Sequence, residues 1–211
     1  MFPETVRPKT LLVLRTLEKL SFVGDFYLAG GTALALQLGH RQSVDLDFFI
    51  KKLPTHQKIL DNLRREKPFI LPSDETGLNL EIQSVKVSFL QYPYPLLEPT
   101  LDYEGLKLAG ILDIACMKLN AVMQRGEKKD FYDLFEILQK YSLEEILSSH
   151  EEKFKDFETE KLSLLKALLY FDDADGSAEP ILIKKTPWKK IKEKISAEVT
   201  DFTKNQKIFK S

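Results

Sequence analysis

The hydrophobic pattern of the chain changes near residue 112, and this change limits the fold more than any other feature of the sequence. Before it, short apolar runs of strand length alternate with amphipathic stretches. After it, apolar residues recur at helical spacing. A chain of 211 residues with 43% apolar residues can bury a sizeable core. We therefore predict an α+β fold with two domains: residues 1–110, a mixed sheet with helices, and residues 111–211, a helical half packed against it.

The first part contains a turn and two strands that matter for function. The apolar run that starts at Phe26 stops at Gly30 and Gly31, which predicts a buried strand ending in a glycine turn. Thr32 is expected to cap a helix that ends at Gly39. In the next strand, apolar and acidic residues alternate. We expect Val44, Leu46 and Phe48 on one side of the strand, and Asp45 and Asp47 on the other side.

The remaining elements follow from periodicity and from cap residues. We expect a helix at 8–20, a helix containing Ile59 and Leu63, and strands at 69–71, 78–82, 85–90 and 105–108. In the second part we expect helices at 112–125, 128–141 and 157–171, a capping box from Ser142 to Glu145, and a polar break at 172–177. Pro187 opens a last helix, whose apolar stripe comprises Trp188, Ile191, Ile195, Val199 and Phe202.

Charge and cysteine content exclude several classes of protein. The net charge of -1 argues against a generally basic nucleic-acid-binding protein, although residues 184–210 hold nine lysines and three acids. Such a run is usually a solvated helix face. The single cysteine, Cys116, excludes an intrachain disulfide and makes a thiolate metal cluster implausible. No apolar run approaches the ~18–20 residues that span a bilayer, so we expect a cytoplasmic protein without membrane or secretion segments.

Asp45 and Asp47 are the first candidates for chemistry. On one strand face their α-carbons would lie ~6.5–7 Å apart. Hard cations such as Mg²⁺, or Mn²⁺, take oxygen ligands and keep substrate phosphates in their remaining positions. Gly30, Gly31 and Thr32 lie one helix upstream, where backbone N–H groups at a helix N-terminus could face a metal-bound triphosphate. In the alternative interpretation, the two aspartates only solvate the open face of a strand, and Gly30, Gly31 and Thr32 form an ordinary strand-to-helix turn.

Three segments resemble a known family: LAGGTALAL at residues 28–36, GHRQSVDLDFF at 39–49, and KLNAVMQRGEKKDFYDL at 118–134. The first two look like the signature of the AbiEii/AbiGii-type nucleotidyltransferase toxins, which include the MenT toxins. These belong to the polymerase-β-like nucleotidyltransferase superfamily. The third segment is similar to the family's second block.

The resemblance implies a role for each residue of the first block. Gly30, Gly31 and Thr32 would hold the phosphates of an NTP, and Asp45 and Asp47 would bind Mg²⁺. The segment also contains Ser43, which we add to the nucleotide-binding residues. His40 and Arg41 are weaker candidates, because loop residues of these types often lie at the surface.

The second block would complete the site. The resemblance implies that Lys118 contacts the triphosphate and that Asp130 is the second-block carboxylate. Lys118 and Arg125 are seven residues apart, so both can point into one cleft, and we assign Arg125 to nucleotide binding. Asp130 and Asp133 could meet these cations from the next helix. The structural alternative is a salt-bridged seam between two helices.

The third metal carboxylate of the superfamily has no clear counterpart in this sequence. Ser88 stands on the later strand where many members carry an acid. Asp130 could supply this group, Glu81 could reach in from the neighbouring strand, or the site could work with two carboxylates.

The function implied is transfer of a nucleoside monophosphate from an NTP to an acceptor hydroxyl, with release of pyrophosphate. In the family the acceptor can be the 3′ end of tRNA, the outcome is growth arrest or phage defence, and a neighbouring antitoxin neutralises the toxin. The alternatives are an enzyme that modifies a small molecule or a protein, and a catalytically silent nucleotide- or protein-binding module. If RNA is the acceptor, the lysines of 184–210 are expected to contact its phosphates.

Overall fold

The computed structural model describes residues 1–155 and 160–205. The chain divides into two compact units, Met1–Gly110 and Ile111–Ser211, and we treat each by itself. The correspondence of these units to functional domains stays a prediction. Within the described ranges, no helix combines the length and the apolar composition that a membrane span requires.

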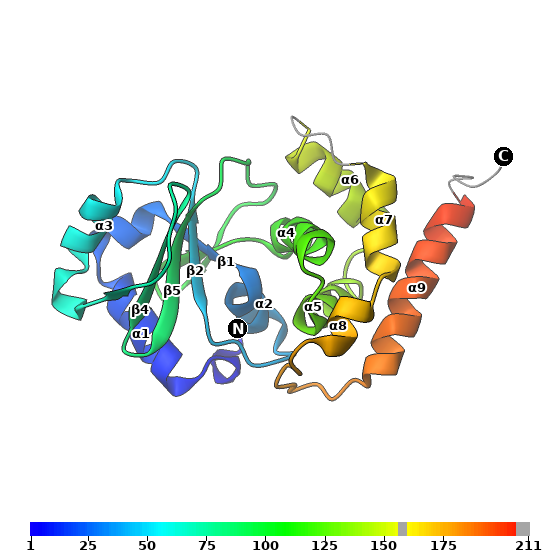
Figure 1. Ribbon diagram of the computed structural model, residues 1–211, viewed down its shortest axis with the longest axis horizontal. Coiled ribbons are helices and arrows are strands. Elements are labelled where there is room, and N and C mark those ends of the chain that lie inside the picture. Colours follow the sequence, from blue (N-terminus) through cyan, green and yellow to red (C-terminus); the bar gives the residue numbers. More distant parts are fainter. Residues whose placement is uncertain (156–159, 206–211) are drawn as a thin grey trace. The chain divides into compact units, whose positions relative to one another are not determined.

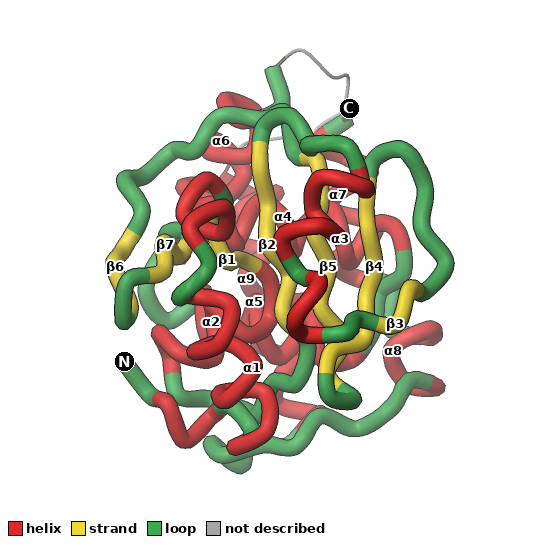
Figure 2. The backbone as a smooth tube through the Cα atoms, turned by 90° about the vertical axis from the view of Figure 1, so that its left-hand side faces the viewer, coloured by secondary structure: helices red, strands yellow, loops and turns green. Residues whose placement is uncertain are grey.

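Unit 1 is built on a mixed seven-stranded sheet with the order β3-β4-β5-β2-β1-β7-β6. Figure 1 labels its strands β4, β5, β2 and β1, and Figure 2 labels every strand of the sheet. Strand β2 is antiparallel to β1 and parallel to β5. Helices α1 and α3 lie on the sheet face that is turned to the viewer in Figure 2. The elements are α1 Pro8–Glu18, β1 Tyr27–Ala29, α2 Gly30–Leu38, β2 Leu46–Ile50, α3 His56–Asn62, β3 Phe69–Ile70, β4 Gly77–Ile82, β5 Val85–Gln91, β6 Leu101–Tyr103 and β7 Leu106–Leu108. The α+β prediction is confirmed.

The core of unit 1 is aromatic and surrounds β2. Phe48 and Phe89 stack with ring centroids 5.4 Å apart, and Phe26 meets Phe89 edge-on at 5.2 Å. Aromatic pairs in these geometries add to the stability gained from burial. The helix α2 ends, as expected, at Gly39, whose φ of 66° is left-handed and costs little without a Cβ.

Three details of unit 1 differ from the sequence predictions. Strand β2 begins at Leu46, and Val44, expected on the same side of the strand as Leu46 and Phe48, is 37% exposed because it precedes the paired strand. Strand β6 was not predicted, since three residues carry too little pattern. Thr32 does not cap α2: β1 runs directly into the helix at Gly30, so Thr32 already lies within the first turn.

Unit 2 is helical. Its elements are α4 Ile111–Gln124, α5 Lys128–Ile137, α6 Leu143–Lys153, α7 Lys161–Leu169, α8 Asp172–Gly176 and α9 Trp188–Asn205. The capping box between Ser142 and Glu145 is confirmed at the start of α6. The stretch predicted as a polar break contains α8, a short helix that begins with two aspartates. Of the helix expected at 157–171, residues 157–159 lie outside the described residues.

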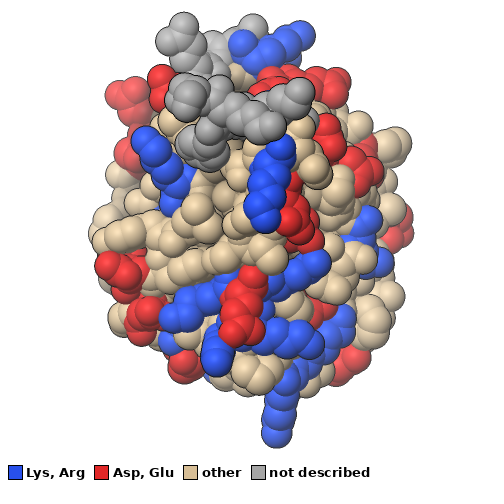
Figure 3. Space-filling model, turned by 90° about the vertical axis from the view of Figure 1, so that its right-hand side faces the viewer, with Lys and Arg blue, Asp and Glu red and all other residues tan. Residues whose placement is uncertain are grey.

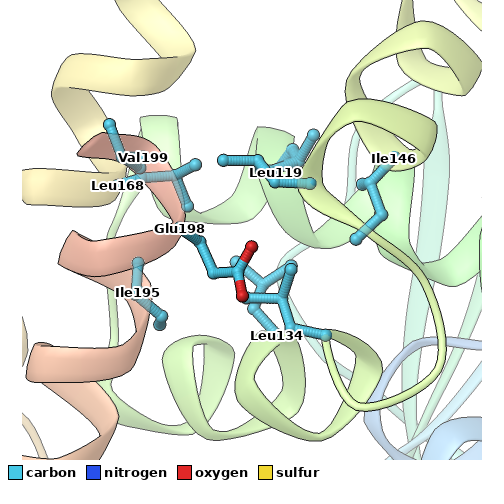
Figure 4. Close-up of a pocket in the computed structure, with 9 residues that line it drawn as sticks. Leu119, Leu134, Ile146, Leu168, Ile195, Glu198 and Val199 are labelled. Carbon is cyan, nitrogen blue, oxygen red and sulfur yellow. The ribbon is translucent and has the colours of Figure 1, made fainter. Parts of the chain in front are cut away.

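The apolar stripe of α9 is the largest contribution of the C-terminal segment to the core. Ile191, Ile195, Val199 and Phe202 are buried against α5, α6 and α7. The crevice between these helices, about 10 Å³ in volume and shown in Figure 4, is lined almost wholly by apolar side chains. The carboxylate of Glu198 is the exception, and it pairs with Lys194 of the preceding turn. A space of this size holds at most one water molecule, so the crevice is part of the core and not a ligand site.

Two buried polar contacts link α6 to α4. Lys153 Nζ lies 2.6 Å from Asp113 Oδ1, and both side chains are fully buried. His150 Nε2 lies 2.7 Å from Asn120 Oδ1. Burial lowers the pKa of His150 to about 4, which keeps this imidazole neutral at pH 7.

Candidate active site

The turn between β1 and α2 brings a glycine against a carboxylate. Ala29 pairs with Asp47 across β1 and β2, and Gly30 follows with a φ of +69°. A Cβ at Gly30 would lie 3.1 Å from Asp47 Oδ2, which is tighter than an ordinary van der Waals contact. Glycine is therefore needed here for its backbone conformation and for the space that Asp47 takes.

The second glycine makes room for a buried arginine. A Cβ at Gly31 would lie 2.6 Å from Arg41 Nη2 and 3.1 Å from Ser43 Oγ. Arg41 and His40 are both buried, so the surface alternative does not hold for them, and their contact with nucleotide stays a prediction. Arg41 Nη1 also donates to the Gln42 carbonyl at 3.0 Å. The burial of Arg41 had no signal in the sequence, because it depends on the packing of α2 against this loop.

Thr32 fixes the backbone that carries the first aspartate. Its hydroxyl donates to the Asp45 carbonyl and lies 2.8 Å from Ser43 Oγ. The Ser43 backbone N–H donates in turn to the Thr5 carbonyl at 3.0 Å. Thr32 and Ser43 are thus tied to protein groups, and their contact with nucleotide stays a prediction.

The strand beside Asp47 carries neutral polar groups. Asp47 pairs with Ser88 of β5, and Ser88 pairs with Asn79 of β4. The Ser88 hydroxyl donates to Asn79 Oδ1 at 2.9 Å. Glu81, the alternative acid, lies two residues along β4 in register with Lys86 and is exposed.

The donor set of unit 1 fits a magnesium ion that shares its ligands with a substrate. In the part of the chain that the structure describes, no group of three or more histidine, cysteine or acidic side chains is assembled around one point. Asp45 and Asp47 are partly exposed on adjoining segments of the chain. Mg²⁺ is commonly held by one or two carboxylates and by substrate phosphates, so two exposed aspartates are a sufficient protein contribution.

The second block is assembled in unit 2, between α4 and α5. Lys118 Nζ lies 2.7 Å from Asp130 Oδ1 and 2.6 Å from Asp133 Oδ2. Arg125 binds the Asp130 carboxylate with two nitrogens: Nε lies 3.1 Å from Oδ2, and Nη2 lies 3.2 Å from Oδ1. Lys118 and both aspartates are buried, whereas the Arg125 side chain is 51% exposed. The four residues that sequence spacing grouped are therefore together, in the arrangement that a salt-bridged seam would also have.

The electrostatics of this cluster keep Asp130 ionised. Burial raises the pKa of Asp130, but the Lys118 charge and the hydrogen bonds from Arg125 and Lys118 outweigh it, so the pKa lies below its ordinary value. A carboxylate that stays charged can hold a cation in place or accept a hydrogen bond from substrate.

The comparisons with known proteins agree with these two blocks. The family model described as "Nucleotidyl transferase AbiEii toxin, Type IV TA system" matches residues 12–207, which include both. The chain belongs to this AbiEii family. A protein of unknown function from Aquifex aeolicus (strain VF5) is 36% identical over 205 residues, covering 91% of this chain and 95% of the relative.

Solved structures show the same fold. A structure from Helicobacter pylori, described as a "putative nucleotidyltransferase", has a TM-score of 0.59 at 17% identity, with 97% of this chain and 99% of that chain covered. MenT4, a nucleotidyltransferase toxin from Mycobacterium tuberculosis H37Rv, has a TM-score of 0.58 at 16% identity, with 92% of this chain and 84% of that chain covered. This AbiEii protein is thus a nucleotidyltransferase-family enzyme of the toxin–antitoxin type, with the nucleotidyltransferase fold.

Proposed function

We propose that this AbiEii protein transfers a nucleoside monophosphate from an NTP to the 3′-terminal hydroxyl of an RNA, with tRNA as the acceptor. A bond forms between the acceptor oxygen and the α-phosphorus, the bond from that phosphorus to the bridging oxygen of the β-phosphate breaks, and pyrophosphate leaves. The main observation behind the proposal is the close approach of the Asp47 carboxylate to Gly30, in the turn that joins β1 to α2.

Unit 1 would hold the phosphates. Asp45 and Asp47 are the residues that would bind Mg²⁺ or Mn²⁺, and the ion would neutralise phosphate charge and lower the pKa of the acceptor hydroxyl. Gly30 and Gly31 let Asp47 and Arg41 approach the backbone at the start of α2, where the N–H groups of the first helical turn would meet a phosphate. Thr32 holds the Asp45 carbonyl, so the backbone that carries this carboxylate is fixed before substrate arrives.

Unit 2 would supply charge. Lys118 is assigned to the leaving phosphates and Asp130 to the acceptor side, where the ionised carboxylate would orient the Lys118 and Arg125 cations that bind it. Asp133 keeps Lys118 in place through the second ion pair. Arg125 is the exposed cation of the cluster and is assigned to nucleotide or acceptor phosphate.

A neighbouring antitoxin is the expected partner. The family description names a type IV toxin–antitoxin system, in which a separate protein counteracts the toxin. Expression of the chain alone is then expected to arrest growth, and the Asp47→Asn variant is expected to be harmless.

A small molecule is the second candidate acceptor. The structure of the resistance factor ANT(2″)-Ia in complex with adenylyl-2″-tobramycin has a TM-score of 0.51 at 11% identity, over 70% of this chain and 99% of that chain. This likeness is one of fold. The adenylylated aminoglycoside in that complex supports a small molecule as the alternative acceptor.

One experiment separates the acceptors. The purified protein is incubated with each of the four α-³²P-labelled NTPs, Mg²⁺ and, in parallel, total RNA, a protein lysate or an aminoglycoside. We expect label in a tRNA-sized band, and none with Asp45→Asn or in EDTA. Label in protein or aminoglycoside alone would replace the RNA acceptor, and the absence of label from every acceptor would contradict the proposed transfer.

A further inference from the structure

Unit 2 carries an open groove beside the second block. Its volume is about 450 Å³, and it lies between the C-terminal end of α4 and the segment that runs from α7 into α8. A groove of this size is in the range of small-ligand sites, typically ~300–1,000 Å³. The lining residues used below are Met123, Arg125, Ser163, Lys166, Tyr170 and Asp173.

The groove is continuous with the cluster around Asp130. Arg125 lines the groove and also binds both oxygens of Asp130, which Lys118 contacts from the other side. A ligand that touches Arg125 is therefore separated from the assigned second-block carboxylate by one guanidinium group. No residue outside Ile111–Ser211 is needed to form this connection.

The side chains of the groove match the parts of a nucleotide. Arg125 and Lys166 provide two cations for phosphate. Tyr170, which is 53% exposed, and Met123, which is also exposed, offer a flat ring and an adaptable apolar surface for a base. Ser163 and Asp173 provide a hydroxyl and a carboxylate for sugar hydroxyls or base edges.

The lysines of α9, predicted from sequence to contact RNA, are less suited to this task. Lys189 and Lys194 pair with acids one turn on, Glu193 and Glu198, and Lys192 contacts Asp175. Figure 3 shows acidic side chains among the basic ones on the face of the molecule that it displays. Each ion pair offsets a positive charge that RNA phosphates would otherwise meet. Asp130 offsets the charge of Arg125 in the same way, so Lys166, which forms no ion pair among the described residues, provides the uncompensated positive charge of the groove.

We propose that this groove binds single-stranded nucleotides of the RNA acceptor, next to the end that receives the nucleotidyl group. The inference rests on the proposed function and adds a binding site to it. Tyr170 stacks on a base, and Lys166 and Arg125 contact the adjoining phosphates. Because stacking and charge read no particular base, binding here is expected to depend strongly on salt and weakly on sequence.

The test is RNA binding measured without turnover. Fluorescence anisotropy of a fluorescein-labelled, mixed-sequence single-stranded RNA is recorded for the wild type, Tyr170→Ala and Lys166→Gln over a salt series. We expect Tyr170→Ala to raise Kd at least fivefold and Lys166→Gln to raise it about threefold, with a salt slope smaller by about one.

Two variants outside the groove serve as matched controls. Leu169→Ala alters an exposed neighbour of Tyr170, and Lys161→Gln removes a lysine from the same helix, α7. Both are expected to stay within twofold of the wild type.

Transfer kinetics supply the second readout. In Tyr170→Ala the KM for RNA is expected to rise while kcat at saturating RNA and the KM for NTP stay near the wild-type values, because the groove holds the acceptor and not the NTP. If groove variants bind RNA as the wild type does, while Gln at Lys189, Lys190, Lys192 and Lys194 weakens binding, the α9 surface is the RNA site and the groove assignment is wrong.

Failure of the groove and failure of the proposed function give different results. If the wild type labels RNA, and the groove variants label it equally well at low RNA concentration, the groove assignment is wrong and the proposed function stands. A wild type that binds RNA through Tyr170 but labels another acceptor would overturn the proposed acceptor and leave the groove an RNA site. Loss of antitoxin binding in the groove variants, with RNA binding intact, would make the groove a protein-docking surface and overturn the inference.

Discussion

Asp47 of β2 stands directly opposite Ser88 of β5 in a parallel pair. The position at which the resemblance to the superfamily places a third acid is Ser88, and its hydroxyl donates to Asn79. The alternative supplied by β4, Glu81, is exposed and in register with Lys86. The proposed metal binding in unit 1 would then depend on Asp45 and Asp47, and we expect each of them to be indispensable.

Removing either carboxylate is expected to abolish transfer without unfolding the protein. Asp45→Asn and Asp47→Asn each take away one metal ligand from a partly exposed position, so thermal stability should change little. Asp102→Asn, on the exposed edge strand β6, is the matched control and should keep full activity. Activity within about threefold of the wild type in either variant, ~0.7 kcal/mol in barrier, would show that the metal assignment is wrong.

Gly30→Ala is expected to damage the site through Asp47. The positive φ costs an alanine about 1 kcal/mol, and the new Cβ would press on Asp47 Oδ2. We expect a drop in thermal stability and a loss of transfer of at least tenfold. The control is Gly24→Ala, where a Cβ would have nothing within 4 Å. Wild-type turnover by Gly30→Ala would mean that the close approach of Asp47 has no catalytic importance.

Asp130 is expected to matter for both activity and stability. Asp130→Asn leaves Lys118 and Arg125 without their shared carboxylate, and breaking a buried pair commonly costs about 3–5 kcal/mol. Chemical unfolding and transfer per folded molecule are measured together. Normal turnover of the folded fraction would make Asp130 a purely structural residue, and Glu81→Gln would then be the variant to examine for the missing acid.

The lowered pKa of Asp130 should make the stability of the folded protein depend on pH in the acid range. Because the folded-state pKa lies below the unfolded value of about 3.9, the stabilisation is complete above that pH and is lost as the pH falls toward the folded-state value. The wild type should therefore lose part of its stability below about pH 4. Asp130→Asn should lack that component.

His150 should produce a separate pH dependence at milder acidity. Its folded-state pKa of about 4 lies below the ordinary histidine value of about 6.5, so the unfolded chain takes up the proton first as the pH falls. Stability is complete above about pH 6.5 and should decline by about 2 kcal/mol between pH 7 and pH 5. Urea unfolding at both pH values measures this loss. In His150→Gln, which keeps a donor for Asn120, the curves at the two pH values should nearly coincide. An unchanged slope in this variant would assign the acid sensitivity to other groups.

Local signals in the sequence were sufficient for much of the fold. The Ser142–Glu145 capping box, the left-handed end of α2 at Gly39 and the buried stripe of α9 are set by a few neighbouring residues, and each was predicted. Strand β6 and helix α8 were missed because each is too short for a periodic pattern. What stabilises them comes from partners elsewhere in the fold.

The candidate site also contains contacts that the sequence predicted and contacts that it did not. Lys118 and Arg125 are seven positions apart, about two helical turns, so their common association with Asp130 could be predicted from the sequence. The burial of Arg41 beside Gly31, and the hydrogen bond from Thr32 to the Asp45 carbonyl, depend on how α2 packs on the loop before β2. No local pattern specifies such contacts.

Helix α9 also sets the order in which unit 2 can be completed on the ribosome. Its buried stripe packs against α5, α6 and α7, which are all synthesised before it. Until residues 188–205 have emerged, those three helices lack the surface that covers them, and α5 carries Asp130 and Asp133. We therefore expect a nascent chain to acquire its second block late in translation, so that an interrupted message yields a harmless fragment instead of an active toxin.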